Sequence, residues 1–232
     1  MPTRIRALPD PCGVDGTETA QRFLTSAHES VQAVLTTLDT VRDVRRNQGQ
    51  NVTGRLTSQE EDLLRAAVVF TGAGLDSTLK RLIRDTLPRL LETNEQAHKK
   101  FEAFTVQRLG TAEIADTRMV ARYLVAENPR AQLIDDYIYD LTGSSLQSAE
   151  QVQSTAGALG IDDGELRQQI NTLVPLFTAR NQVSHELDLQ QPERPGDRTR
   201  RTRRMAATVT LCGDGFVVAQ RVVNGVGNLL DT

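Results

Sequence analysis

Residues 57–92 read TSQEEDLLRAAVVFTGAGLDSTLKRLIRDTLPRLLE, and this segment predicts one long helix. A capping box, either Thr57 with Glu60 or Ser58 with Glu61, stands directly before its first apolar residues. Apolar side chains then recur at three- and four-residue steps, as a helix with one buried face requires. These residues are Leu63, Leu64, Ala67, Val68, Leu75, Leu79, Leu82, Ile83 and Leu87.

Two glycines and one proline lie inside this predicted helix. Gly72 and Gly74 each cost a helix about 1 kcal/mol relative to alanine, and we expect them to permit close packing of a neighbouring helix. Pro88 is expected to kink the helix before the pattern stops near Glu92. The segment is therefore expected to form a continuous but bent helix.

Outward from this segment, most of the chain has a helical pattern. Residues 19–47 predict a long amphipathic helix, and residues 163–187 predict a helix bent at Pro175. Short turns separate the other helical patterns, which cover 95–109, 111–126, 130–141 and 148–159. Residues 1–16 hold three prolines and no periodic pattern, so they predict a flexible N-terminal tail, either disordered or loosely draped on the domain. We expect residues 17–232 to form a single helical domain.

The last segment, residues 205–230, admits two interpretations. Thr208–Leu211 and Phe216–Val218 flank a Gly-Asp-Gly turn and would suit a β-hairpin. Apolar residues at helical spacing nevertheless continue over seven turns, and this longer pattern favours a helix. No strong strand pattern appears between the other predicted helices. The sequence therefore predicts an all-α fold.

The amino-acid composition agrees with a helical fold and indicates the cellular compartment of the protein. Aromatic residues make up 4% of the chain and Trp is absent, which argues against an aromatic-rich β-sandwich and a base-stacking platform. The two cysteines form no disulfide framework, so a reducing cytoplasm is expected. The longest hydrophobic run, Ala66–Phe70, is too short to cross a bilayer. No membrane association is predicted.

The segment Arg180-Asn181-Gln182-Val183-Ser184-His185 places a cation, an amide and an imidazole within two helical turns. A metal-free ribonuclease needs a guanidinium to hold phosphate charge and an imidazole to move protons. An Arg and a His at such a spacing arise readily by chance, and Arg22 with His28 is a second instance. Asn181 distinguishes the later segment, because only Arg46 and Arg180 are followed by Asn.

Helix geometry suggests separate roles for these three side chains. On an ideal helix Arg180 and His185 point about 140° apart, whereas Asn181 and His185 share a face. Asn181 is therefore expected to hydrogen-bond to His185, while Arg180 approaches the substrate from the side. The bend at Pro175, or a helix end near His185, would bring all three into one cleft. The structural alternative is that Arg180 and His185 satisfy carbonyls or pair with nearby carboxylates at a helix end.

Ribonuclease chemistry of this kind favours a dimer. Attack of a ribose 2′-hydroxyl on its phosphate requires removal of one proton, delivery of another, and stabilisation of the charged intermediate. A single motif supplies one imidazole. A twofold homodimer would place two His185 and two Arg180 side chains in a composite active site.

A second basic segment follows the motif. Six arginines lie between residues 194 and 204 against one carboxylate, Asp197. Such a cluster would attract a phosphate backbone. The structural alternative is a solvated helix start, or pairing with acidic residues such as those in 135–140.

The sequence provides no strong pattern for a metal or cofactor. Asp136 and Asp140 have a spacing that would suit Mg²⁺, but a solvated helical face is the preferred interpretation. Zinc-ligand spacing and a phosphate-binding loop ending in Gly-Lys-Ser or Gly-Lys-Thr do not occur. We therefore predict neither a metal nor a cofactor.

With these features the chain resembles the HEPN superfamily, the higher eukaryote and prokaryote nucleotide-binding helical domains. The resemblance is carried by Arg180-Asn181-x-x-x-His185 at a helix end, by the helical region before it, and by an Arg-rich final helix after a short loop. Residues 71–84 also resemble the early helix of bacterial members found in defence loci.

The resemblance implies an all-α up-and-down bundle of about seven or eight helices, with residues 95–159 as a helical insertion. It also implies a homodimeric, metal-independent endoribonuclease that acts on RNA, such as tRNA, in a toxin–antitoxin or antiphage defence system with an antitoxin or defence-system partner protein. Arg180 and His185 would be catalytic, with Asn181 in support. The implied RNA-binding residues are Arg200, Arg201, Arg203, Arg204, Lys80 and Arg84, with Asp76 supporting them.

A second class of function fits the same sequence. The chain would then be a non-catalytic helical module, either an RNA-binding sensor or a protein-interaction subunit. Mutation of Arg180 and His185 would leave its function unchanged, whereas charge reversal in the basic segment would abolish RNA binding.

Overall fold

The computed structural model describes residues 3–110, 117–146 and 148–231. Every regular element within these residues is a helix, apart from one isolated bridge between Leu189 and Arg200. The predicted all-α helical bundle is confirmed.

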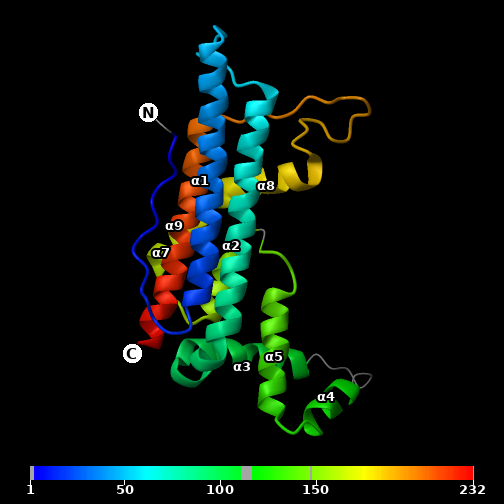
Figure 1. The fold of residues 1–232 in the computed structure, drawn as a ribbon. Helices are drawn as coiled ribbons and strands as arrows, with labels where there is room; N and C mark the ends of the chain where they lie inside the picture. Colours follow the sequence, from blue (N-terminus) through cyan, green and yellow to red (C-terminus); the bar gives the residue numbers. More distant parts are fainter. Residues whose placement is uncertain (1–2, 111–116, 147, 232) are drawn as a thin grey trace.

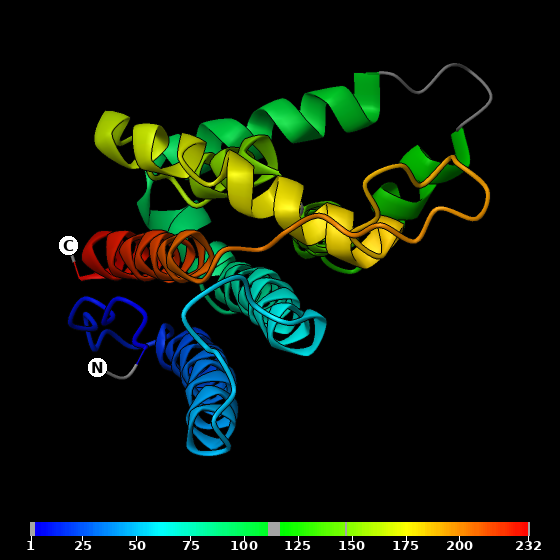
Figure 2. The same cartoon turned by 90° about the horizontal axis from the view of Figure 1, so that it is seen from above.

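Three long helices form the frame of the molecule. Helices α1 (Glu18–Asn47), α2 (Ser58–Thr93) and α9 (Met205–Leu230) run side by side, and Figure 2 shows them end on. Helix α2 also contacts α8, α3 and α5, so it is the central element of the fold. The apolar stripe predicted along α2 forms much of the core, which includes Leu64, Val68, Leu75, Leu79, Leu82, Ile83 and Leu87.

The predicted capping box begins α2. Thr57 is the N-cap: its Oγ1 accepts a hydrogen bond from the Glu60 N–H, and its own N–H donates to Glu60 Oε2 at 2.7 Å. The Glu60 side chain is fully buried and also accepts from Arg45 Nη1 at 2.7 Å. Burial raises the pKa of Glu60, but the hydrogen bonds from Thr57 and Arg45 more than offset this effect, so the pKa lies below its ordinary value of 4.5.

The lowered pKa of Glu60 predicts acid sensitivity. A carboxyl whose pKa is lower in the folded state stabilises the fold above its unfolded pKa, and this contribution is lost as the pH falls through the folded pKa. We expect Glu60→Gln to lower the free energy of unfolding at about pH 7 and to have a smaller effect below about pH 4. Urea unfolding of both proteins across this range measures the difference. An equal difference in unfolding free energy at about pH 7 and below about pH 4 would show that the charge of Glu60 does not stabilise the fold.

The glycines of α2 permit close helix packing, as predicted. A Cβ atom at Gly74 would lie 2.3 Å from the Cβ of Ala27 on α1, so any larger residue would force the two helices apart. Helix α2 then continues through Pro88 and ends at Thr93. Gly72 faces a different neighbour, described below.

The described residues of the region 95–159 contain four helices, packed at one end of the frame (Figure 1). They are α3 (Glu95–Gly110), α4 (Thr117–Leu124), α5 (Pro129–Thr142) and α6 (Ala149–Ala158). Phe101, Phe104 and Tyr137 join α3 to α5 through aromatic contacts, and α5 and α3 both pack on α2. This region therefore shares the core of the frame. Residues 111–116, predicted to be helical, lie outside the described residues.

The prediction of one bent helix over residues 163–187 was wrong. The chain forms two helices, α7 (Gly164–Asn171) and α8 (Val174–Glu186), and Pro175 lies in the first turn of α8. The first N–H groups of a helix have no intrahelical partner, so proline costs nothing there. Pro175 therefore begins the helix that carries the Arg-Asn-His motif.

The final segment is the helix α9, as the longer pattern predicted. Within the described residues, α9 is also the one helix long and apolar enough to span a bilayer, although polar residues interrupt its hydrophobic sequence. Most of its apolar stretch, 61%, is buried against other helices of the bundle. That burial is typical of the core helix of a soluble protein.

Residues 3–16 form no helix, and they lie along α1 and α9 with specific contacts. Ile5 is buried, and its N–H donates to Gln32 Oε1 at 3.1 Å. The Cys12 N–H donates to Asn224 Oδ1, also at 3.1 Å. The segment predicted as a flexible tail is thus held against the bundle at several points.

Candidate active site

The Arg-Asn-His motif occupies the C-terminal half of α8. The helix ends one residue after His185, where Leu187 and Asp188 adopt left-handed conformations with φ of 51° and 61°. The Asp188 N–H donates to the Gln182 carbonyl at 2.8 Å and so closes the last turn. The predicted helix end near His185 is present, and it leaves His185 exposed.

Arg180 and His185 lie within reach of one another. The distance from Arg180 Nη1 to His185 Nε2 is 3.4 Å, and the same Nη1 donates to Asn181 Oδ1 at 3.0 Å. Because a guanidinium only donates, His185 Nε2 is the acceptor in this contact. At 3.4 Å the contact is a long hydrogen bond, which a bound anion would readily replace. We call these two residues the Arg180–His185 pair.

On an ideal helix Arg180 and His185 point about 140° apart, but here the long side chain of Arg180 brings its guanidinium to the imidazole beside the helix end. The expected partner of Asn181 was wrong. Asn181 was expected to hydrogen-bond to His185, whereas its amide oxygen accepts from Arg180. Asn181 thus positions the guanidinium and not the imidazole.

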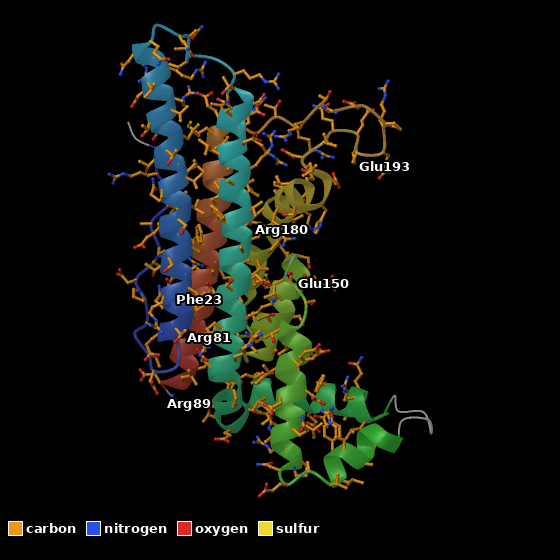
Figure 3. The ribbon with its side chains drawn as sticks, turned by 45° about the vertical axis from the view of Figure 1, so that its right-hand side comes forward. Phe23, Arg81, Arg89, Glu150, Arg180 and Glu193 are labelled. Carbon is orange, nitrogen blue, oxygen red and sulfur yellow. The ribbon has the colours of Figure 1, made fainter. Side chains whose placement is uncertain are left out.

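Gly72 of α2 makes room for Arg180. A Cβ atom at Gly72 would lie 2.9 Å from Cγ of Arg180 and 3.7 Å from its Cδ, so the stem of the arginine lies directly on the glycine. Figure 3 shows Arg180 at the junction of α8 with α2. The sequence marked Gly72 as a packing position but gave no signal that its partner would be Arg180.

This contact predicts the effect of a single methyl group. Gly72→Ala should displace the Arg180 stem and weaken both of its hydrogen bonds, while alanine favours the helical backbone by about 1 kcal/mol. We expect the RNA cleavage proposed below to slow about tenfold or more, because Arg180 would be misplaced, with little loss of thermal stability. Ala73→Ser, on an exposed face of the same turn, is the control. An unchanged cleavage rate in Gly72→Ala would show that the proposed reaction does not depend on the position of Arg180.

A buried ion-pair network fixes the end of α8. The Asp188 side chain is fully buried, and its Oδ2 accepts from Arg65 Nε at 2.7 Å and from Arg203 Nε at 3.0 Å. Burial lowers the pKa of Arg65, but the hydrogen bonds and charges of Asp188 and Asp62 outweigh it and raise the pKa above its ordinary value. The network therefore holds two arginines around one carboxylate, three residues beyond His185.

The basic segment does not form part of α9, contrary to the expected Arg-rich final helix. Most of it precedes the helix, and Arg204 is the N-cap. Arg203 donates to Asp188 and to Gln182 Oε1, and Arg201 pairs with Glu186 at 3.0 Å. Arg200 pairs with Asp62 at the surface at 2.5 Å. These contacts give Arg201 and Arg203 a structural role, whereas Arg200 and Arg204 remain exposed.

A loop projects from the body between the motif and α9 (Figure 1). It is closed at its base by the bridge between Leu189 and Arg200 and by the Gln190 N–H, which donates to the Thr199 carbonyl at 2.8 Å. Arg194 and Arg198 are exposed on this loop. Among the arginines of the basic segment, these two lie farthest from the anchored base of the loop.

Asp76, Lys80 and Arg84 follow Gly72 at four-residue steps on α2, but Asp76 and Arg84 contact the end of α5 and the segment that follows it. Asp76 pairs with Lys80 at 3.1 Å and accepts from the Leu146 N–H at 2.7 Å. Arg84 donates to Thr142 Oγ1 at 3.3 Å. They therefore brace residues 142–146, and no contact in the described residues joins them to the Arg180–His185 pair.

The described residues contain no group of three or more His, Cys, Asp or Glu side chains placed to hold a metal ion. Asp136, considered as a metal ligand, accepts instead from Arg122 at 2.7 Å and from Tyr123 at 2.5 Å. Within the same residues, no carboxylate forms an ion pair with Arg180. The pair thus combines an unneutralised cation with an exposed imidazole.

Comparison of the chain with protein-family models, curated proteins and solved structures returned no significant match. A functional assignment therefore has to come from the geometry of the site.

Proposed function

We propose that the protein is a metal-independent endoribonuclease whose Arg180–His185 pair acts on an RNA phosphate. The observation that carries the proposal is the 3.4 Å contact between an arginine without a carboxylate partner in the described residues and an exposed histidine. A buried or paired arginine would stabilise the fold. Arg180 is half-buried and has no carboxylate partner in the described residues, and Asn181 and Gly72 hold it so that it can meet an anion from outside.

The proposed reaction is transesterification. A neutral His185 removes the proton of the ribose 2′-hydroxyl, O2′ forms a bond to phosphorus, and the bond from phosphorus to O5′ breaks. Arg180 holds the charge that develops on the phosphate oxygens. A protonated imidazole delivers a proton to O5′, so the products are a 2′,3′-cyclic phosphate and a 5′-hydroxyl.

One chain provides one imidazole at this site, and the reaction uses one as base and one as acid. The proposal therefore includes a homodimer in which the exposed C-terminal ends of two α8 helices face each other. Membership of the HEPN superfamily, a role in toxin–antitoxin or antiphage defence with an antitoxin or other partner protein, and a cytoplasmic location belong to the same proposal.

The product ends test the reaction. The purified protein, incubated with total tRNA in EDTA, is expected to leave 2′,3′-cyclic phosphate and 5′-hydroxyl ends, which end-specific ligation detects. Cleavage that leaves 5′-phosphate and 3′-hydroxyl ends would contradict transesterification. If the protein binds RNA with strong salt dependence but leaves it intact, the result would favour the second function, a non-catalytic RNA-binding sensor. The exposed side chains of Arg194 and Arg198 are the observation that favours this second function.

A further inference from the structure

A basic groove lies at the end of the bundle where the loop between α1 and α2 meets the start of α9. Its volume is about 480 Å³. Four of its lining residues are arginines, Arg42, Arg55, Arg203 and Arg204, and one is a carboxylate, Glu61. We call it the arginine groove. It is separate from the Arg180–His185 pair, which lines no part of it.

Two of the four arginines are available to a ligand. Arg42 donates to the Val52 carbonyl and Arg203 is held by Asp188, so both have fixed partners. Arg55 is 73% exposed, donates a hydrogen bond to Thr202 Oγ1 at 3.0 Å and forms a long ion pair with Glu61 Oε1 at 3.7 Å. Arg204 is exposed and forms no ion pair in the described residues. Arg55 and Arg204 therefore give the groove its positive charge.

The N-terminus of α9 opens at the same place. Arg204 is its N-cap, no side chain caps the helix, and no acidic residue lies in its first turn. The first N–H groups of a helix carry partial positive charge and bind anions when no side chain occupies them. A 26-residue helix with this end beside two exposed arginines is suited to phosphate.

Glu61 places a second chemical requirement on any ligand of the groove. It is 5% exposed, and its Oε2 accepts from Arg65 at 3.2 Å. Its Oε1 is buried at the groove without a hydrogen-bond partner, with Arg55 Nε no closer than 3.7 Å. Buried polar atoms are normally satisfied. The unpartnered oxygen calls for a donor group, such as a hydroxyl or an amine, beside the bound anion.

We propose that the arginine groove binds a phosphorylated ribose. Arg55, Arg204 and the N-terminus of α9 hold the phosphate, and a ribose hydroxyl or base amine donates to Glu61 Oε1. Inorganic phosphate alone would leave Glu61 unsatisfied, and an uncharged nucleoside would leave the arginines unused. The ligand is either a free nucleotide or one nucleotide of a bound RNA. This site does not depend on ribonuclease activity.

Binding measurements test the groove independently of cleavage. Isothermal titration with ADP, with pyrophosphate and with a short RNA oligonucleotide uses the full chain carrying His185→Ala, so that RNA stays intact. The double variant Arg55→Glu/Arg204→Glu is expected to lose about a hundredfold in affinity, since each removes a charge-assisted contact. Arg22→Glu, exposed on the opposite half of α1, is the matched control and should change affinity little.

Three outcomes decide the proposal. ADP binding that the double variant abolishes supports a free nucleotide, and RNA binding without ADP binding, lost in the same variant, supports an RNA nucleotide. ADP should bind more tightly than pyrophosphate, and Glu61→Gln should reduce that preference. If neither ADP nor RNA binds, or if the double variant binds as well as Arg22→Glu while remaining folded by circular dichroism, the groove is not such a site.

Discussion

Replacing Asp188 with alanine is expected to lower the free energy of unfolding by about 3 to 5 kcal/mol, because removing one partner leaves buried charges uncompensated. Asp188 is fully buried between Arg65, whose side chain is 7% exposed, and Arg203, at 14%. Arg203 would lose its carboxylate partner, and Arg65 would keep only Glu61 and Asp62. For a chain of this size the loss corresponds to a fall in Tm of roughly 6 to 20 °C.

A second variant separates charge from backbone conformation. Asp188 has φ of 61°, a region that Asn tolerates and that costs Ala about 1 to 2 kcal/mol. Asp188→Asn removes only the charge, so this variant should show most of the loss in unfolding free energy that Asp188→Ala shows. Asp162→Ala, which breaks an exposed pair with Arg167 at 3.0 Å, is the control and should cost under about 1 kcal/mol. Urea unfolding measures the free energy of unfolding of all three variants. A loss below about 1 kcal/mol for Asp188→Asn would show that the network does not stabilise the end of α8.

Local patterns in the sequence predicted most of the fold. The apolar stripe of residues 57–92, its capping box and the long pattern of 205–230 are signals within single helices, and each appears in the structure. Pro175 was misread because the same residue bends a helix from inside and begins one from its first turn. The sequence alone did not show which turn Pro175 would occupy.

The site was harder to predict because its geometry depends on tertiary contacts. The motif was visible, but the pairing of Arg180 with His185 depends on the rotamer of a long side chain resting on Gly72. Asp188 lies far in sequence from Arg65, so their contact carried no local signal. The arginines of residues 200–204 looked alike in sequence, and only the fold separates the buried Arg203 network from the exposed Arg204.

His185→Ala is expected to have the largest effect on activity. General acid–base groups contribute roughly 10² to 10⁴ in rate, and in a composite dimer this substitution removes both imidazoles from the site. His185 is exposed and contacts only Arg180 through its ring nitrogens in the described residues, so its loss should leave Tm nearly unchanged. A fall in activity without a fall in stability would separate catalysis from folding.

The matched control is His98→Ala. His98 is also exposed on a helix, and its Nδ1 lies 3.4 Å from the Leu91 carbonyl, but no arginine pairs with it in the described residues. Its replacement should leave the cleavage rate within about twofold of wild type, as expected for surface positions away from the site. A similar loss in both variants would point to a general effect of removing histidine.

The central claim is that His185, oriented at α8 beside Arg180, moves the proton during RNA cleavage. Its most direct test is the single-turnover rate of 2′,3′-cyclic phosphate formation in EDTA, measured for wild type and for folded His185→Ala. Catalysis by His185 predicts that the variant is slower by at least about a hundredfold. Equal rates in the two proteins would contradict it.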